Sequence, residues 1–356
     1  MGWRADVYVP LNYPAKLLYR KTGLNSIGMT RIRNPLIRKI VSHLWRSVCL
    51  CFALFRYRYF LFYGTMDVWP SRCDRLLGMF FGPSFRAYLS IGKVFGRKML
   101  YLASGCLGEE LKSNFSQLDN GDVCGNCGVS ECQDELQIPS FNVHRRYADF
   151  VFGNGYYAPT CFSVTHIKYK SLDLNLWHPD ISIPKRFLLP PTRSLRILHG
   201  FYEGGRTSDG KNIKGSRFVL EAIEKLRNEG CAVEYYYLQD VQSKDMLYYQ
   251  AQADVVVDQL IYGWWGSMGL EAMGLGKPVV CYLRKEWKDF FYTVFPEYDA
   301  LPIVEADTHT IYDVLKRLVT DDAFRASKGR EARVFAEHHF DVRKNVRTLE
   351  EVLKEL

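Results

Sequence analysis

The chain of 356 residues is long enough for two domains, and its composition, 47% hydrophobic and 24% charged, is that of a globular protein. Its longest apolar run near the start, residues 47–55, is far shorter than the roughly 20 residues that a membrane-spanning helix needs. No apolar secretory segment follows Met1. We therefore expect a soluble cytoplasmic protein.

The formal net charge of +8 is unevenly distributed along the chain. Residues 1–105 contain 17 Lys and Arg against 3 Asp and Glu, a net charge of +14, so the remaining residues carry −6. Basic residues such as Arg38 and Arg56 alternate with aromatic ones, which favours peripheral binding to an anionic surface at the inner face of the membrane. A solvated basic helix face is the alternative. No recognition motif accompanies the charge, so we expect no nucleic-acid partner.

Hydrophobic periodicity predicts a short strand at residues 5–9, a helix at 36–55, and buried strands at 58–63, 98–103 and 147–152. Strands separated by helical stretches are typical of a parallel sheet with crossover helices. Residues 1–180 are therefore predicted to form one Rossmann-like domain.

A proline-rich stretch at residues 173–192 indicates a linker, and the alternation restarts beyond it. Strands are predicted at 195–199, 233–238, 254–260 and 278–283, helices at 216–229, 245–252 and 270–275, and a last helical region from about residue 308. The sequence thus predicts an α/β protein with a second Rossmann-like domain at 181–340 and a C-terminal helix at 341–356.

The stretch at residues 254–278 joins a predicted strand, a glycine-rich loop and a helix. The strand places Asp258 at its carboxyl end, and Gly263, Gly266 and Gly269 remove side chains that would keep a pyrophosphate away from the backbone. Backbone N–H groups at the start of such a helix can bind a phosphate, helped by the helix dipole. An ordinary crossover without a ligand is the alternative.

Two further features support a nucleotide site here. The helix is predicted to begin at Ser267 or Met268, and Glu271 lies one turn into it, where its carboxylate can accept both hydroxyls of a ribose. Upstream, Lys214 lies in a loop that follows the strand at 195–199, and its role is given below by the family resemblance.

These motifs resemble the donor site of GT-B-fold glycosyltransferases of the family-4 type, which consist of two Rossmann-like domains with a cleft between them. The resemblance implies that Glu271 binds the ribose of a nucleotide sugar and that the amides of Gly266, Ser267 and Met268 hold its diphosphate. It also implies that Lys214, with Arg206 as the nearest candidate for an accompanying arginine, stabilises the departing diphosphate.

The sequence departs from the family pattern in two places. Gly263 stands where the family has the first of two glutamates, the one that contacts the transferred sugar, and Asp258 or nearby backbone is the candidate to replace it. The chain also begins at about the second strand of the usual N-terminal domain.

On the acceptor side, the sequence Ser104-Gly105-Cys106 follows a predicted strand, and its loop loosely matches the family's loop that faces the transferred sugar. The aspartate and arginine of that loop are missing, so Glu109 and Glu110 are candidate carboxylates, with a solvated helix start as the alternative for each. His144 and Arg145 are predicted to lie on a helix surface.

Four cysteines cluster in the sequence and include a C-x2-C pair, in a loop rich in turn residues: Cys106, Cys124, Cys127 and Cys132. Four thiolates suit a structural zinc ion, and an iron–sulfur cluster uses similar ligands. Free thiols are the alternative. A metal here would hold the loop at 106–132 rather than perform chemistry.

The sequence therefore predicts a glycosyltransferase of the hexosyl type that moves a sugar from a nucleotide-sugar donor to a hydroxyl acceptor, such as a glycan or a lipid-linked acceptor. The resemblance implies retention at the anomeric carbon, no catalytic metal, and a setting in polysaccharide or glycolipid synthesis. A sugar-nucleotide epimerase and a non-catalytic nucleotide-sugar-binding protein stay open as alternatives.

Overall fold

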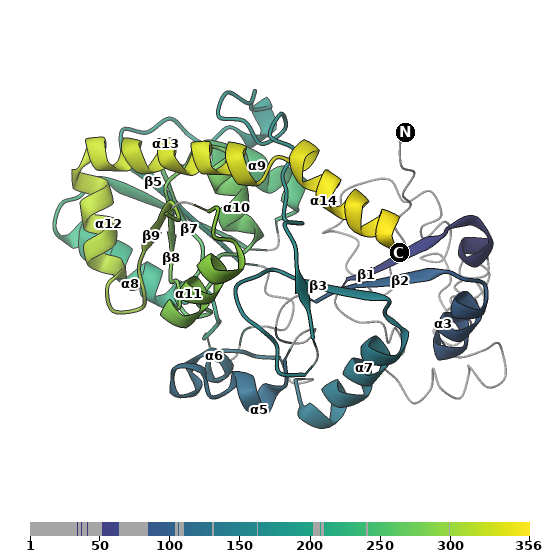
Figure 1. Cartoon of the computed structure of the whole chain (residues 1–356). Coiled ribbons are helices and arrows are strands. Elements are labelled where there is room, and N and C mark those ends of the chain that lie inside the picture. The colour runs from purple at the N-terminus through teal and green to yellow at the C-terminus, as the bar shows by residue number, and fades with distance from the viewer. Residues whose placement is uncertain are drawn as a thin grey trace.

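The protein folds as two α/β units that lie side by side (Figure 1). The computed structural model describes residues 34, 37, 41, 52–63, 85–103, 106, 110–129, 132–161, 163–201, 207, 210–239, 241–298 and 300–356. The predicted strand at 5–9 and most of the predicted helix at 36–55 lie outside these residues.

The first unit contains a parallel sheet whose four strands follow the order β1 (Tyr59–Tyr63), β2 (Lys98–Leu102), β3 (Phe150–Gly153) and β4 (Thr165–His166). Among the described residues, the helices of this unit include α3 (Phe85–Val94), α5 (Lys112–Phe115), the 3-10 helix η3 (Leu118–Gly121), α6 (Asp122–Gly125) and α7 (Asp134–Tyr147), and residues 52–56 are also helical. Leu89 of α3 and Val143 of α7 pack against Met99 and Tyr101, which cover one face of the sheet.

The second unit contains a parallel sheet in the order β6 (Val233–Gln239), β5 (Leu195–Phe201), β7 (Val255–Val257), β8 (Val279–Cys281) and β9 (Ile303–Glu305). Its helices are α8 (Ser216–Asn228), α9 (Ser243–Ala251), α10 (Ser267–Gly274), α11 (Lys285–Val294), α12 (Ile311–Thr320) and α13 (Asp322–His339), and the 3-10 helix η4 (Lys185–Phe187) precedes the sheet.

Alternate residues of the β5–β9 sheet point to opposite faces, and each face has its own core. Val255 and Val257 pack with α8 and α12, whereas Val256, between them, packs with α10 and α13. Because both faces are covered, the central strands β7, with the sequence VVV, and β8, with VVC, are apolar throughout, as is typical of a buried parallel sheet.

Two segments of the chain pass between the two units, and they lie side by side at residues 170–172 and 341–345. Leu172 pairs with Asp341 in an isolated parallel bridge, and the Asn345 side chain donates 2.6 Å to the Lys170 carbonyl. Beyond this point α14 (Val342–Glu355) crosses to the first unit (Figure 1), where Leu353 packs against the free face of its sheet. The Tyr59 hydroxyl donates 2.8 Å to the Leu353 carbonyl.

The predicted α/β architecture of two parallel sheets is confirmed. One boundary is wrong, because the strand predicted from residue 147 begins at Phe150, and residues 134–147 form α7. The last helical region is divided by Asp321 and Asp341, whose side chains cap the amides of Phe324 and Arg343 and so begin α13 and α14. None of the described helices combines the length and apolar character needed to cross a membrane.

Candidate functional site

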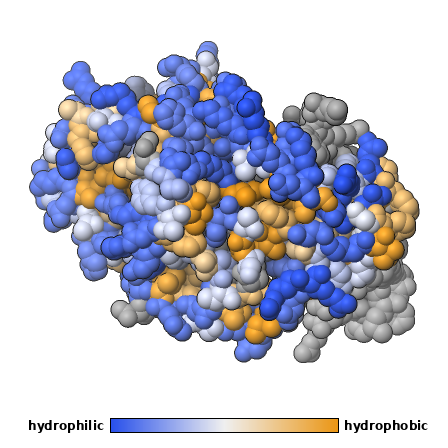
Figure 2. All heavy atoms as spheres, viewed as in Figure 1, coloured by the Kyte–Doolittle hydropathy of each residue, from blue (hydrophilic) through white to orange (hydrophobic). Residues whose placement is uncertain are grey.

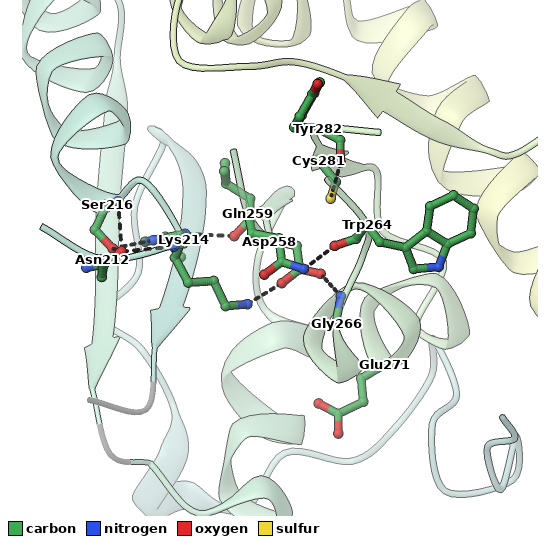
Figure 3. Close-up of polar contacts among 12 residues, drawn as sticks. Asn212, Lys214, Ser216, Asp258, Gln259, Trp264, Gly266, Glu271, Cys281 and Tyr282 are labelled. Carbon is green, nitrogen blue, oxygen red and sulfur yellow. Dashed lines mark hydrogen bonds and ion pairs between the residues drawn. The ribbon is translucent and has the colours of Figure 1, made fainter. Parts of the chain in front are cut away.

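Asp258 lies at the carboxyl end of β7, where the predicted strand places it, and it is fully buried. Its carboxylate forms an ion pair with Lys214 and accepts a 2.5 Å hydrogen bond from the Gly266 N–H, at the start of α10 (Figure 3). A buried carboxylate needs such partners, and the positive end of the helix dipole adds to them.

The loop before α8 holds Lys214 in place. The Asn212 side chain accepts hydrogen bonds from the Lys214 N–H, 3.1 Å, and from the Ser216 hydroxyl, 3.2 Å. The Lys214 carbonyl accepts from the Leu260 N–H, 3.1 Å, which ties this loop to the one after β7. Gly215 has φ +73°, a conformation that favours glycine.

Asp258 changes the interpretation of the glycines. A Cβ atom at Gly269 would lie 2.8 Å from the Asp258 carboxylate, and one at Gly266 would lie 3.5 Å from it. The absence of a side chain at Gly269 therefore makes room for an internal carboxylate, whereas the contact at Gly266 is an ordinary van der Waals distance. The Lys214 ammonium and the Gly266 amide, both predicted to contact a phosphate, already contact Asp258.

Glu271 lies on the helix that begins beside Gly266 (Figure 3), but its hydrogen-bond partners are different. Its carboxylate accepts from the Ser243 hydroxyl, 3.2 Å, and from the Gln250 amide, 3.4 Å, both on α9. Burial is the main cause that raises the pKa of Glu271 to about 8. Half-buried and paired with neutral groups, this carboxyl lies one turn from the helix start, as predicted.

His199 is a buried residue near Lys214 and Asp258, and it was not among the residues predicted from the sequence. Its ring nitrogens lie 2.8 Å from the Val257 carbonyl and 2.8 Å from the Ser216 hydroxyl. Burial lowers the pKa of His199 to about 4, so the imidazole stays neutral. Its position at alternate spacing inside β5 was the available signal.

Gly263 adopts φ +100°, and a Cβ there would lie 3.0 Å from the Arg284 Cβ and Nε atoms. A side chain at the position where the family has its first glutamate would therefore strain the backbone and crowd Arg284. Ser267 begins α10 with an exposed side chain, whereas Met268 is buried. The predicted partner Arg206 lies outside the described residues.

Of the predicted acceptor-side residues, Ser104, Gly105 and Glu109 lie outside the described part of the chain. The next residue, Glu110, is buried and accepts from the Thr160 N–H, 2.8 Å, and hydroxyl, 2.6 Å. Burial opposes its charge, but hydrogen bonds from Thr160 and Asn114 outweigh this effect and lower the pKa of Glu110.

The prediction that His144 and Arg145 lie on a helix surface is wrong for His144. Its ring is fully buried and stacks on Tyr101 with centroids 3.6 Å apart, because the inner face of α7 packs on β2, whereas Arg145 is exposed. Both residues border a hollow of about 730 Å³ that continues to Thr160, Ser163 and His166.

The four clustered cysteines all lie in the first unit, as free thiols. A hydrogen bond between Cys106 and Cys132 raises the pKa of Cys106 and lowers that of Cys132. Within the described ranges, no group of three or more His, Cys, Asp or Glu side chains is placed to hold a metal ion. The metal site at Cys106, Cys124, Cys127 and Cys132 stays a prediction.

The two units meet beside the loop after β7 in a cluster of aromatic side chains. Tyr156 stacks on Trp264 at 5.3 Å, and its hydroxyl lies 2.9 Å from that of Tyr262. Phe115 of α5 packs against Tyr262 and Trp287 at 5.7 and 6.0 Å. The first unit thus contacts the same loop that holds Asp258 and Gly266.

No protein-family model and no curated protein sequence matches this chain. Solved structures do match its fold. HepE from Anabaena, in complex with UDP and glucose, has a TM-score of 0.54 at 15% identity, over 88% of this chain and 81% of that chain. Sucrose-phosphate synthase from Thermosynechococcus elongatus has a TM-score of 0.54 at 14% identity, over 91% and 79%.

A third structure is an alpha-glucosyltransferase in complex with UDP and a 13-mer DNA, with a TM-score of 0.51 at 11% identity over 86% of this chain and 83% of that chain. At these identities the likeness establishes the fold. The predicted GT-B architecture is confirmed.

Proposed function

Because the chain has the GT-B fold of glycosyltransferases, we propose that it transfers a sugar from a nucleotide-sugar donor to a hydroxyl acceptor. The observation that carries the proposal is the arrangement around α10, where Lys214 and the helix start lie on one side and Glu271 on the other. A diphosphate requires cations and N–H donors, and a ribose requires a carboxylate or carboxyl at the right distance.

The donor is proposed to enter with its diphosphate at the Lys214 ammonium and the α10 amides. Lys214 and the Gly266 N–H are then shared between Asp258 and the phosphates, or Asp258 turns aside. As the bond between the anomeric carbon and the phosphate oxygen breaks, the acceptor oxygen bonds to that carbon and its proton passes to the phosphate. The cationic groups stabilise the charge of the leaving diphosphate.

The finer assignments follow the family resemblance and the matched structures. We propose retention at the anomeric carbon, a hexosyl group, and a uridine diphosphate carrier, since HepE and the alpha-glucosyltransferase were both solved with UDP. Polysaccharide or glycolipid assembly is the proposed setting, and no catalytic metal is required.

The hollow beside α7 is the proposed place for the acceptor. It borders hydroxyl and imidazole groups, and Thr160 and Cys161 on its rim hydrogen-bond to Glu110, at the end of the predicted acceptor loop. An Arg145→Ala variant should raise the acceptor KM without changing donor affinity. An unchanged acceptor KM would remove this assignment.

Membrane attachment is proposed for the end of the molecule where residues 52–56 and α3 lie (Figures 1 and 2). Phe55 and Val94 are 76% and 85% exposed there, beside the exposed Arg56 and Arg58. Apolar tips among arginines suit an anionic lipid surface. Co-sedimentation with vesicles should require anionic lipid and should weaken in a Phe55→Ser variant, and equal binding to neutral vesicles contradicts it.

Calorimetry with a panel of nucleoside diphosphates and their sugars tests the donor site. We expect binding of a uridine compound and its loss in Glu271→Ala. Product analysis with the donor alone and with the acceptor then separates transfer from epimerisation, since an epimerase needs no acceptor. If no nucleotide binds, the proposal fails.

A second candidate function is nucleotide-sugar binding without transfer. It is favoured by the ion pair of Lys214 with Asp258, which engages the proposed catalytic ammonium inside the protein. Tight binding with neither transfer nor hydrolysis of the donor across a range of acceptors would select it.

A further inference from the structure

Arg284 lies between β8 and α11 and contacts both units of the fold although only 3% of it is exposed. Its backbone N–H donates a 2.9 Å hydrogen bond to the Gly263 carbonyl. Its side-chain Nη2 donates a 3.3 Å hydrogen bond to the Tyr262 carbonyl. Its Nη1 forms an ion pair with Asp119 of η3, in the other unit. One buried side chain therefore joins the loop after β7 to the N-terminal unit.

The shape of that loop depends on Arg284. The backbone of Gly263, at φ +100°, lies very close to the arginine. A Cβ atom added to Gly263 would lie 3.0 Å from the Cβ and Nε atoms of Arg284. Three residues later the same loop supplies the Gly266 N–H to Asp258, 2.5 Å. A displacement of Arg284 would therefore move the backbone that begins α10.

Asp119 is held in an unusual conformation for this contact. Its φ of +46° makes it the one described residue other than glycine in the left-handed region. Side chains disfavour this region, although Asp and Asn tolerate it best, and such backbones are found where the surroundings enforce them. The surrounding segment also packs on the other unit, through Phe115 on Trp287 and through Gly128 on the Thr207 backbone.

We propose that Arg284 is a positioning residue that couples closure of the two units to the shape of the loop at residues 259–266. The Arg284–Asp119 pair exists only when the units meet, so it stabilises the closed state and no other. In that state the arginine holds the loop that aligns Gly266, Asp258 and Lys214. The inference rests on the proposed function and adds the residue that makes the alignment of a bound donor for transfer, rather than its binding, depend on domain closure.

Arginine suits this task because its planar fork can donate to a backbone carbonyl and a carboxylate at once. A lysine provides a point charge and cannot keep both contacts in the same geometry. Arg284→Lys should therefore keep the charge but lose part of the coupling.

Asp119→Asn is the test variant, because asparagine tolerates a left-handed backbone as well as aspartate does and removes only the charge. We expect the nucleotide dissociation constant to change less than about twofold, since the donor contacts of the C-terminal unit remain. We expect kcat/KM to fall by about 10- to 100-fold, the size that a displacement near 1 Å produces. Hydrogen exchange of the amides at 259–266 should become faster.

Asp289→Asn is the matched control, because Asp289 pairs with Lys285 on the exposed side of α11, next to Arg284. It should leave kcat/KM and exchange unchanged. If Asp119→Asn also leaves both unchanged, the proposal is overturned. It is also overturned if binding, rate and melting temperature fall together, because that pattern indicates a structural role only.

Two measurements keep this test separate from the proposed function. X-ray scattering should show a larger radius of gyration for Asp119→Asn than for the wild type, and exchange at 259–266 needs no substrate. If the wild type binds no nucleotide, the proposed function fails, whereas these two readouts still decide whether the Arg284–Asp119 pair couples closure to the loop.

Discussion

Asp258 and Glu271 lie near opposite ends of one turn of α10 (Figure 3), and their hydrogen-bond partners are of different kinds. At the helix start, Asp258 has an ammonium and a backbone N–H. One turn along, Glu271 has a hydroxyl and an amide, and burial raises its pKa to about 8. The first carboxylate is part of the folded framework, whereas the hydrogen-bond partners of the second are neutral side chains on α9, and it is suited to a ligand with hydroxyl groups.

The largest effect is expected for Asp258→Ala. It leaves the Lys214 side chain, only 13% exposed, without a counter-charge and the Gly266 amide without its acceptor, so the free energy of unfolding should fall by about 3–5 kcal/mol. Urea denaturation at pH 7 measures this loss. Asp258→Asn, which keeps an acceptor for the amide, should lose less, and equal stability of Asp258→Ala and wild type would contradict a structural role for this carboxylate.

A smaller loss at the same side is expected for Gly269→Ala. The added Cβ would lie 2.8 Å from the Asp258 carboxylate and must displace it, which should cost roughly 1–3 kcal/mol as other overpacked cores do. Thermal unfolding measures it. Ser267→Ala, exposed at the same helix start, is the control and should change little. A stable Gly269→Ala would show that Asp258 has room to move.

The contribution of Glu271 to the stability of the fold is expected to depend on pH. Its pKa is about 8 in the folded protein against 4.5 for an ordinary glutamate, so the folded state binds more protons between these values. The contribution of Glu271 to stability is therefore greatest below pH 4.5 and declines as pH rises to about 8. Glu271→Gln should remove this decline. The free energy of unfolding of the variant minus that of the wild type should therefore increase as the pH rises. A constant difference would contradict the raised pKa.

The smallest effect is expected for Ser243→Ala. It removes one 3.2 Å hydrogen bond to Glu271 and should cost about 0.5–1.5 kcal/mol. Because this bond lowers the pKa of Glu271, its loss should raise that pKa further and shift the pH dependence upward. Comparing the pH–stability curves of Ser243→Ala and wild type measures the shift, and a downward shift would exclude the contact.

Much of the C-terminal unit could be predicted because its signals are local. Runs of valine bounded by turn residues predicted β7 and β8, and the glycine-rich loop with Glu271 placed α10 within a residue of its observed start. In the N-terminal unit, the bounds of α7 were not predicted, and His144 was assigned to the surface of a helix. Pro139 inside the helix and a weak apolar pattern make α7 hard to predict from the sequence, and they do not indicate which of its faces tertiary packing buries.

The sequence by itself determined the alternation of strands and helices, the two parallel sheets, and the residue types around α10, because hydrophobic period and turn chemistry act between near neighbours. Only the tertiary structure decided which groups pair. Lys214 meets Asp258 across 44 residues, and Arg284 meets Asp119 from the other unit. Such pairs depend on how the sheets and loops pack. Burial of a charge requires a nearby counter-charge, but the residue that supplies it is decided by tertiary packing.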